Sequence, residues 1–121
     1  MNPEYAEMVL KRFEEPDEVR EMALGRFELV RLGGMTSGRA TYQPGWLVRT
    51  RRAQFGTESL QVEHVGLVLS GAATAAFSDG RVIEIRAGDL FYIPPEPHDS
   101  WVLGNQPYVS LHFLGAEHYA K

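Results

Sequence analysis

The sequence predicts an all-β protein built as a two-sheet barrel, and the observations that predict it lie in residues 71–99. Three short apolar runs, ATAAF, RVIEI and DLFYI, are separated there by a Ser-Asp-Gly turn at 78–80 and an Ala-Gly pair at 87–88. Asp-Gly supplies the positive φ angles of a tight hairpin, and the second glycine lets the chain bend into the next strand. Short strands with a turn about every eight residues are typical of all-β sandwiches and barrels. A Pro-Pro-Glu-Pro run then ends the pairing and leads into a lone histidine, His98.

Composition sets the outer limits of the function. A chain of 121 residues is the size of one domain, and 44% hydrophobic residues are ordinary for a globular protein. A net charge of −4 without a basic run predicts no nucleic-acid partner. No apolar segment approaches the roughly 20 residues of a membrane span and no secretion signal is evident, so we expect no membrane partner and a cytoplasmic location. Since cysteine is absent, a metal ion would need nitrogen and oxygen ligands.

Residues 1–24 are expected to form an N-terminal arm with an edge strand and a turn, ahead of a barrel domain over residues 25–121. The segment VLKRF at 9–13 is predicted to be a short strand. Pro16 and the acids after it suit one helical turn, because proline and acidic residues favour a helix start. The dense charge at 14–18 indicates a solvated edge that packs on the barrel or on a partner subunit.

Two strands, over 26–32 and 38–45, are predicted to join through the glycine-rich segment 33–38. This glycine pattern matches neither common phosphate-binding loop, and no helix obviously follows it, so we expect no phosphate site. The next strand ends in a basic cluster that includes Arg51. We expect a solvated rim there; the alternative is a clamp for an anionic ligand, because arginine presents a planar fork that suits carboxylates.

Residues 61–70 form the most apolar predicted strand. Alternation places His64 on one face of this strand with Gly66 and Val68. Two interpretations of His64 stay open at this point. It is either a ligand or pocket residue, or a neutral, hydrogen-bonded histidine of the core.

The last two strands are predicted over 100–104 and 107–115. On the second of them, His112 shares an alternating face with Tyr108 and Ser110. That polar face lies either in solvent or inside the barrel. Altogether the chain has about ten short strands and almost no helix pattern, which favours a closed two-sheet barrel.

Residues 64–98 resemble the two signature motifs of the cupin superfamily. The first motif ends in an acidic residue, six residues and a glycine, and HVGLVLSG at 64–71 is similar to it. The second places a glycine, five residues and a proline ahead of a histidine, and GDLFYIP at 88–94 runs into His98 in the same way. The resemblance covers about residues 40–114. With PPEPHDSWV and the ending FLGAEHYAK, the chain is most similar to small single-domain cupins of unassigned function. The resemblance implies the double-stranded β-helix, or jelly-roll barrel, of that superfamily.

The resemblance also implies a set of metal ligands. In metal-binding cupins, three histidines and a glutamate hold a divalent metal ion inside the barrel. The second-motif histidine corresponds to His98, with Glu96 where the motif has glycine. The first-motif acidic position falls on His64, and the histidine pair before it falls on Glu58 and Leu60. The implied ligands are therefore His64, His98 and Glu58, with one ligand lost to leucine. Such a set can bind Zn, Ni, Mn or Fe(II) with open coordination positions.

Around these ligands we predict five pocket residues, namely Trp46, Arg51, Tyr92, Trp101 and His112. Aromatic residues in a barrel also serve as core or interface residues.

Other catalytic schemes find little support. No nucleophile elbow surrounds Ser100, and the acids that a glycosidase would need lie mainly in the tail, the turns and the strand ends.

The predicted function is that of a small single-domain cupin that binds a small molecule inside the barrel, with one divalent metal ion as the implied cofactor. One alternative is a metal-dependent enzyme of the dioxygenase or isomerase type, in which the two histidines hold the metal and Glu58 is a third ligand or a base. Another is a metal-free binding or regulatory module, in which Leu60 marks the loss of the metal site. An apolar edge at 9–10 beside an acidic tail predicts a homodimer.

Overall fold

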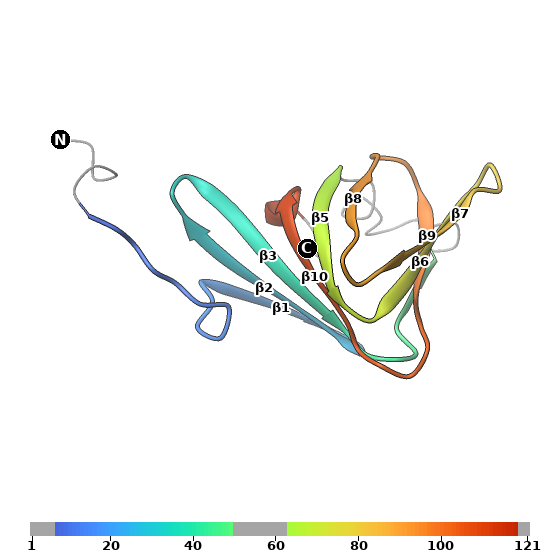
Figure 1. Cartoon of the computed structure of the whole chain (residues 1–121), viewed down its shortest axis with the longest axis horizontal. Helices are drawn as coiled ribbons and strands as arrows, with labels where there is room; N and C mark the ends of the chain where they lie inside the picture. The colour runs from blue at the N-terminus through green and yellow to red at the C-terminus, as the bar shows by residue number, and fades with distance from the viewer. Residues whose placement is uncertain (1–6, 50–62, 119–121) are drawn as a thin grey trace.

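The computed structural model describes residues 7–49 and 63–118, and most of this part of the chain is β-strand (Figure 1). The first antiparallel sheet runs in the order β1 (Glu18–Met22), β2 (Gly25–Leu32), β3 (Met35–Tyr42), β10 (Tyr108–Leu114), β5 (His64–Ser70) and β8 (Leu90–Ile93). The second runs in the order β4 (Leu47–Arg49), β9 (His98–Leu103), β6 (Ala72–Phe77) and β7 (Val82–Arg86). One turn of 3-10 helix, η3 (Ala116–His118), follows β10.

The two sheets form the halves of a jelly-roll barrel, which confirms the predicted all-β class. After β5 the chain passes to the second sheet for β6 and β7, returns for β8, and passes across again for β9. Strands β6, β7 and β9 lie on one side of the barrel in Figure 1, whereas β1–β3 extend away from it. Strands β7 and β8 are edge strands of different sheets, so no ladder of hydrogen bonds joins them.

Tight glycine turns connect the hairpins. Gly33 and Gly34 have φ angles of 59° and 75° and join β2 to β3 as a two-residue turn. The predicted hairpin is therefore confirmed, with a shorter turn, because β3 already begins at Met35. Gly80 and Gly88, with φ of 96° and 95°, lie in the predicted turns on either side of β7.

The N-terminal segment differs from the prediction. Residues 9–13 carry no strand, and the predicted helical turn after Pro16 is strand β1 instead. The Asp17 N–H donates to the Leu29 carbonyl at 2.8 Å, and β1 continues this pairing along β2. The Asp17 carboxylate accepts the backbone N–H of Arg31 at 2.7 Å. Sheet pairing therefore outweighs the weak local preference for a helix start.

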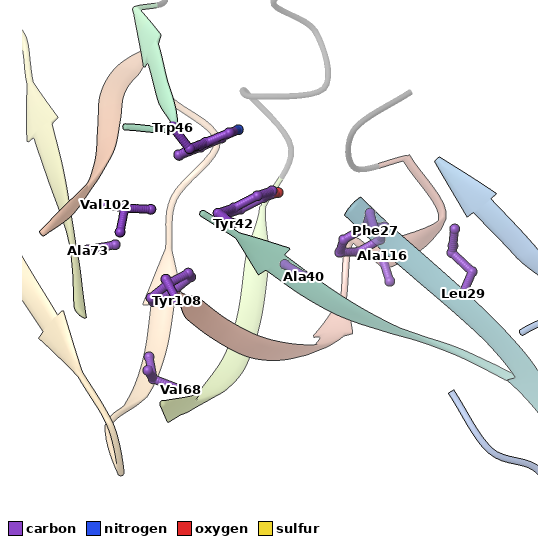
Figure 2. Close-up of a cluster of buried hydrophobic side chains, with 10 residues drawn as sticks. All are labelled: Phe27, Leu29, Ala40, Tyr42, Trp46, Val68, Ala73, Val102, Tyr108 and Ala116. Atoms are coloured by element: carbon purple, nitrogen blue, oxygen red, sulfur yellow. The ribbon is translucent and has the colours of Figure 1, made fainter. Parts of the chain in front are cut away.

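A cluster of buried side chains runs from the barrel into the space beside β1–β3 (Figure 2). Within the barrel, the rings of Tyr42 and Trp46 stack with centroids 4.0 Å apart. Phe27 of β2 is fully buried, and its ring occupies the place where a side chain at Gly38 would stand. Ala116 of η3 belongs to the same buried cluster as Phe27. Among the described residues, no helix has the length and apolar character needed to cross a membrane.

Candidate functional site

Three buried histidines surround one small cavity between the sheets. His64 begins β5, His98 begins β9 and His112 lies on β10, with exposed fractions of 2%, 5% and 5%. The cavity has a volume of about 40 Å³. Aromatic rings form much of its remaining wall: Tyr42, Trp46, Phe91 and Tyr108. Three polar side chains together in a barrel core are unusual, so this inner cavity is the candidate site.

Strand alternation explains why these side chains meet. On β10, Tyr108, Ser110 and His112 are buried, whereas the residues between them are only partly buried. The polar face of this strand therefore lies inside the barrel and not in solvent. On β5 the same alternation buries His64 together with Gly66.

Burial keeps two of the histidines uncharged. It lowers the pKa of His64 to about 4, with a smaller Coulombic contribution from His98. It lowers the pKa of His112 to about 3, with a smaller contribution from His64. Desolvation disfavours the imidazolium form, so both rings are neutral at pH 7. A neutral imidazole carries one N–H donor and one nitrogen lone pair.

Hydrogen bonds orient the rings. Nδ1 of His98 lies 3.0 Å from the Glu96 carbonyl oxygen, and since a carbonyl only accepts, Nδ1–H is the donor. In neutral His98 the lone pair is therefore on Nε2. Ser110 Oγ lies 3.0 Å from Nε2 of His112, and the rings of His64 and His112 meet edge to face with centroids 5.6 Å apart.

His112 is held between two phenylalanine rings. Phe27 and Phe91 contact it edge to face, with centroid distances of 5.3 Å and 5.7 Å. Each ring occupies the space above a glycine of a strand beside β10: Phe27 above Gly38 of β3, and Phe91 above Gly66 of β5. These glycines let the rings approach the sheet closely and fix the His112 side chain between them.

A larger pocket opens next to the inner cavity, between edge strands β7 and β8. This outer pocket has a volume of about 580 Å³. Four side chains line both spaces: Ala75, Ile85, Phe91 and Ile93. The two spaces are therefore adjacent parts of one pocket, apolar towards the surface and histidine-lined at its inner end. We call them together the two-part pocket.

The structure brings four of the predicted site residues together around the inner cavity: Trp46, His64, His98 and His112. Tyr92 lies at the outer pocket instead. Its side chain is exposed, and its hydroxyl donates to the Glu63 carboxylate at 2.6 Å.

Other predicted site residues are placed elsewhere or not described. Trp101 lies on β9 between β4 and β6 and lines neither part of the two-part pocket. Arg51 and Glu58, and Leu60 at the substituted ligand position, fall outside the described residues.

The histidines have the chemistry of metal ligands, because neutral imidazole is a common ligand of transition metals. Their arrangement is less suited to a metal ion. Within residues 7–49 and 63–118, no three histidine, cysteine, aspartate or glutamate side chains are placed to share one ion. By themselves, the described residues therefore do not fit a metal centre.

A series of side-chain contacts connects His98 to the surface. No pattern in the sequence indicates these contacts. The Arg81 guanidinium lies 4.6 Å from the centre of the Phe77 ring, which in turn lies 5.2 Å from the His98 ring. Arg81 also forms an ion pair with the carboxylate of Glu96, whose carbonyl holds His98. The β6–β7 turn and the β8–β9 loop bring these residues together, so only the fold reveals the link.

Replacing Arg81 with alanine is expected to loosen the His98 ring while lowering the free energy of unfolding by less than about 1 kcal/mol, as for other exposed ion pairs. The measurement is ¹⁵N NMR of the imidazole nitrogens, in which the His98 signals should broaden or shift towards the other tautomer. Arg86→Ala is the matched control, because Arg86 forms a similar exposed pair with Glu84. Identical His98 signals in both variants would contradict the expectation.

The chain matches a family of ligand-binding domains. The model of the AraC-like ligand binding domain family matches residues 47–117, which is 71 of the 121 residues. None of the curated proteins matches the chain.

Several solved structures share the fold at low sequence identity. A protein of unknown function from Rhizobium leguminosarum has a TM-score of 0.64 at 19% identity, covering 89% of this chain and 96% of that one. Another, from Acidithiobacillus ferrooxidans, has a TM-score of 0.59 at 21% identity, covering 80% and 86%. The oxalate decarboxylase of Lactobacillus farciminis, solved as a formate complex, has a TM-score of 0.57 at 16% identity. That match covers 81% of this chain but 30% of the decarboxylase.

These neighbours show the cupin barrel as a shared fold, and the family match extends over more than half of the sequence. The three histidines of the cavity lie inside the matched segment, whereas Tyr42 and Trp46 of its wall precede it. The chain belongs to the AraC-like ligand-binding domain family.

Proposed function

We propose that this domain binds one small molecule in the two-part pocket, with the head of the molecule at the histidines and its body between β7 and β8. The observation that carries the proposal is the position of three buried histidines at the inner end of an apolar pocket. Small-molecule sites combine mostly apolar walls with a few convergent polar groups, and this pocket has that composition. Membership of a ligand-binding family supports it.

Filling the pocket tests this proposal. Ala75 lines both parts of the pocket, so Ala75→Leu would place extra methyl groups where the ligand passes. A fragment library screened by ligand-observed NMR should give binders that lose affinity at least about tenfold in this variant, which corresponds to about 1.4 kcal/mol. Ala76→Leu is the matched control, because Ala76 is the next residue of β6 and lines neither space. Binders that Ala75→Leu leaves unaffected would contradict the proposed site.

A second candidate function is the binding of one divalent ion of Zn, Ni, Mn or Fe, favoured by the neutral imidazoles around one cavity. In this candidate His64 and His98 are ligands and Glu58 is the third. Elemental analysis should then find stoichiometric metal in the wild type and its loss in His64→Ala and His98→Ala. A wild type that cannot be loaded with Zn would eliminate this candidate. Dioxygen uptake with Fe(II) and a panel of small acids and diketones would test the dioxygenase alternative.

We also propose that the domain is a homodimer. Met8, Val9 and Leu10 are 82%, 53% and 83% exposed, which is high for three consecutive apolar side chains. Contact with a second copy would cover them. Light scattering should give twice the monomer mass, reduced by Leu10→Glu; a wild-type monomer would contradict the proposal.

A further inference from the structure

The outer pocket and the inner cavity differ so clearly in chemistry that together they specify a class of ligand. We infer that the ligand is an uncharged molecule with an apolar body and a single small head group that both donates and accepts hydrogen bonds. This inference rests on the proposed function, since it concerns the same pocket. Three features of the described residues support it: the outer wall, the charged groups at the rim, and the inner end.

The wall of the outer pocket is mostly apolar, and both edge strands and β6 contribute to it. Its main apolar side chains are Phe77, Ile83, Ile85, Leu90, Phe91 and Ile93. Of these, Leu90 is 76% exposed and Ile83 is 47% exposed, although both are large apolar residues. An apolar ligand body would cover them and gain the hydrophobic free energy of their burial.

The charged side chains of the outer pocket already have partners within the protein. Arg81 pairs with Glu96, and Glu84 pairs with Arg86 at 2.7 Å. The Asp89 carboxylate accepts the backbone N–H of Arg86 at 2.8 Å. A charged ligand would have to displace one of these partners. The described charged groups at the rim therefore add little binding free energy for a ligand with a net charge.

The inner end is polar, because three buried histidine side chains line it. Hydrogen bonds fix two of these rings: the Glu96 carbonyl holds Nδ1–H of His98, and Ser110 Oγ lies 3.0 Å from Nε2 of His112. The nitrogen atoms of an imidazole can donate and accept, and so can the hydroxyl of Ser100, which lines the same cavity. A hydroxyl or a primary amide matches such a mixed set, whereas a carboxylate only accepts and an ammonium only donates.

The size of the inner cavity sets the division between head and body. Its volume is about 40 Å³, compared with about 580 Å³ for the outer pocket. A cavity of roughly 10–15 Å³ already holds one water molecule, so the inner cavity admits a head of only a few non-hydrogen atoms. The remainder of the ligand must stay between β7 and β8.

A matched series of small aromatic probes tests the inference. Benzyl alcohol, benzamide, benzoate, benzylammonium and toluene share a ring and differ in charge and head group. With EDTA-treated wild-type protein at pH 7, titrations followed by NMR should give the alcohol and the amide at least about tenfold lower dissociation constants than the two ions and toluene. His98→Leu should remove the preference for the alcohol over toluene, and Ala75→Leu should weaken every probe. Ala76→Leu should change neither.

The outcomes separate this inference from the function on which it rests. If benzoate or benzylammonium binds more tightly than benzyl alcohol, and Ala75→Leu abolishes that binding, the ligand class is wrong while the pocket remains a binding site. If the probes bind equally well to Ala75→Leu, both the site and the ligand class are wrong. A preference for the alcohol that persists in His98→Leu would show that the histidine end does not select the head group, and would overturn the inference.

Discussion

Replacing Phe27 with alanine is expected to lower the free energy of unfolding by about 4 kcal/mol, within the usual range for a buried phenylalanine. Phe27 is fully buried, occupies the space above Gly38 and meets the His112 ring edge to face. Removing the ring loses its transfer free energy and leaves a cavity beside the site. Urea unfolding followed by circular dichroism measures the change directly.

Phe113→Ala is the matched control for this substitution. Phe113 follows His112 on β10 but points away from the barrel, with 40% of its surface exposed. Its removal should cost less than about 1 kcal/mol, because little buried surface is lost. Comparable losses in the two variants would show that Phe27 does not act as a core residue. The Phe27 variant should also alter the His112 imidazole signals in NMR, and the Phe113 variant should not.

Lowering the pH from 7 to 5 is expected to remove about 2 kcal/mol of stability for each of His64 and His112. The pKa of an unfolded histidine is about 6.5, so the unfolded chain takes up a proton at each position over this range. In the folded protein both rings stay neutral, because their pKa values lie at about 4 and about 3. The unfolded state therefore binds more protons. This contribution to stability is complete above pH 6.5 and is lost as the pH falls towards these folded values.

The measurement is the free energy of unfolding in urea at closely spaced pH values, with EDTA present. The slope of the free energy of unfolding against pH measures how many more protons the unfolded state binds. Below pH 6, His64→Gln should reduce this number by about one, because one of the two titrating rings is gone. Carboxylates contribute little to the change in stability between pH 7 and 5. Glu117, whose pKa is lowered to about 2 mainly by its hydrogen bond from Arg31, loses its contribution only below the ordinary glutamate pKa of 4.5. Constant stability between pH 7 and 5 would mean that the histidines are hydrated in the native state.

The fold could be predicted because its signals are local. The turns at Gly33-Gly34, Gly80 and Gly88 and the alternation of β5 and β10 were readable from neighbouring residues. The N-terminal segment could not be predicted in the same way. There, β1 and β2 form a hairpin in which Met22 pairs with Gly25, and its turn, Ala23-Leu24, has none of the usual turn residues although Leu24 has a φ of 59°.

The candidate site was predictable only in part. Motif resemblance identified His64 and His98, and alternation placed His112 on a polar face without saying which way that face turned. That choice depends on which sheet covers β10, which is a property of the whole barrel. The contacts of Arg81 with Phe77 and Glu96 depend on two turns meeting in space, and no spacing in the sequence encodes them.

The two glycines beneath the phenylalanine rings differ in how they can change during evolution. At Gly38, the three atoms nearest to the place of a methyl group all belong to the ring of Phe27, so a smaller residue at 27 could compensate for alanine at 38. At Gly66, the carbonyl oxygen of Leu111 stands in the way as well as Phe91. A side chain can be exchanged, but a backbone carbonyl cannot. Among related sequences, positions 27 and 38 should therefore vary together, whereas position 66 should stay glycine whatever residue is found at 91.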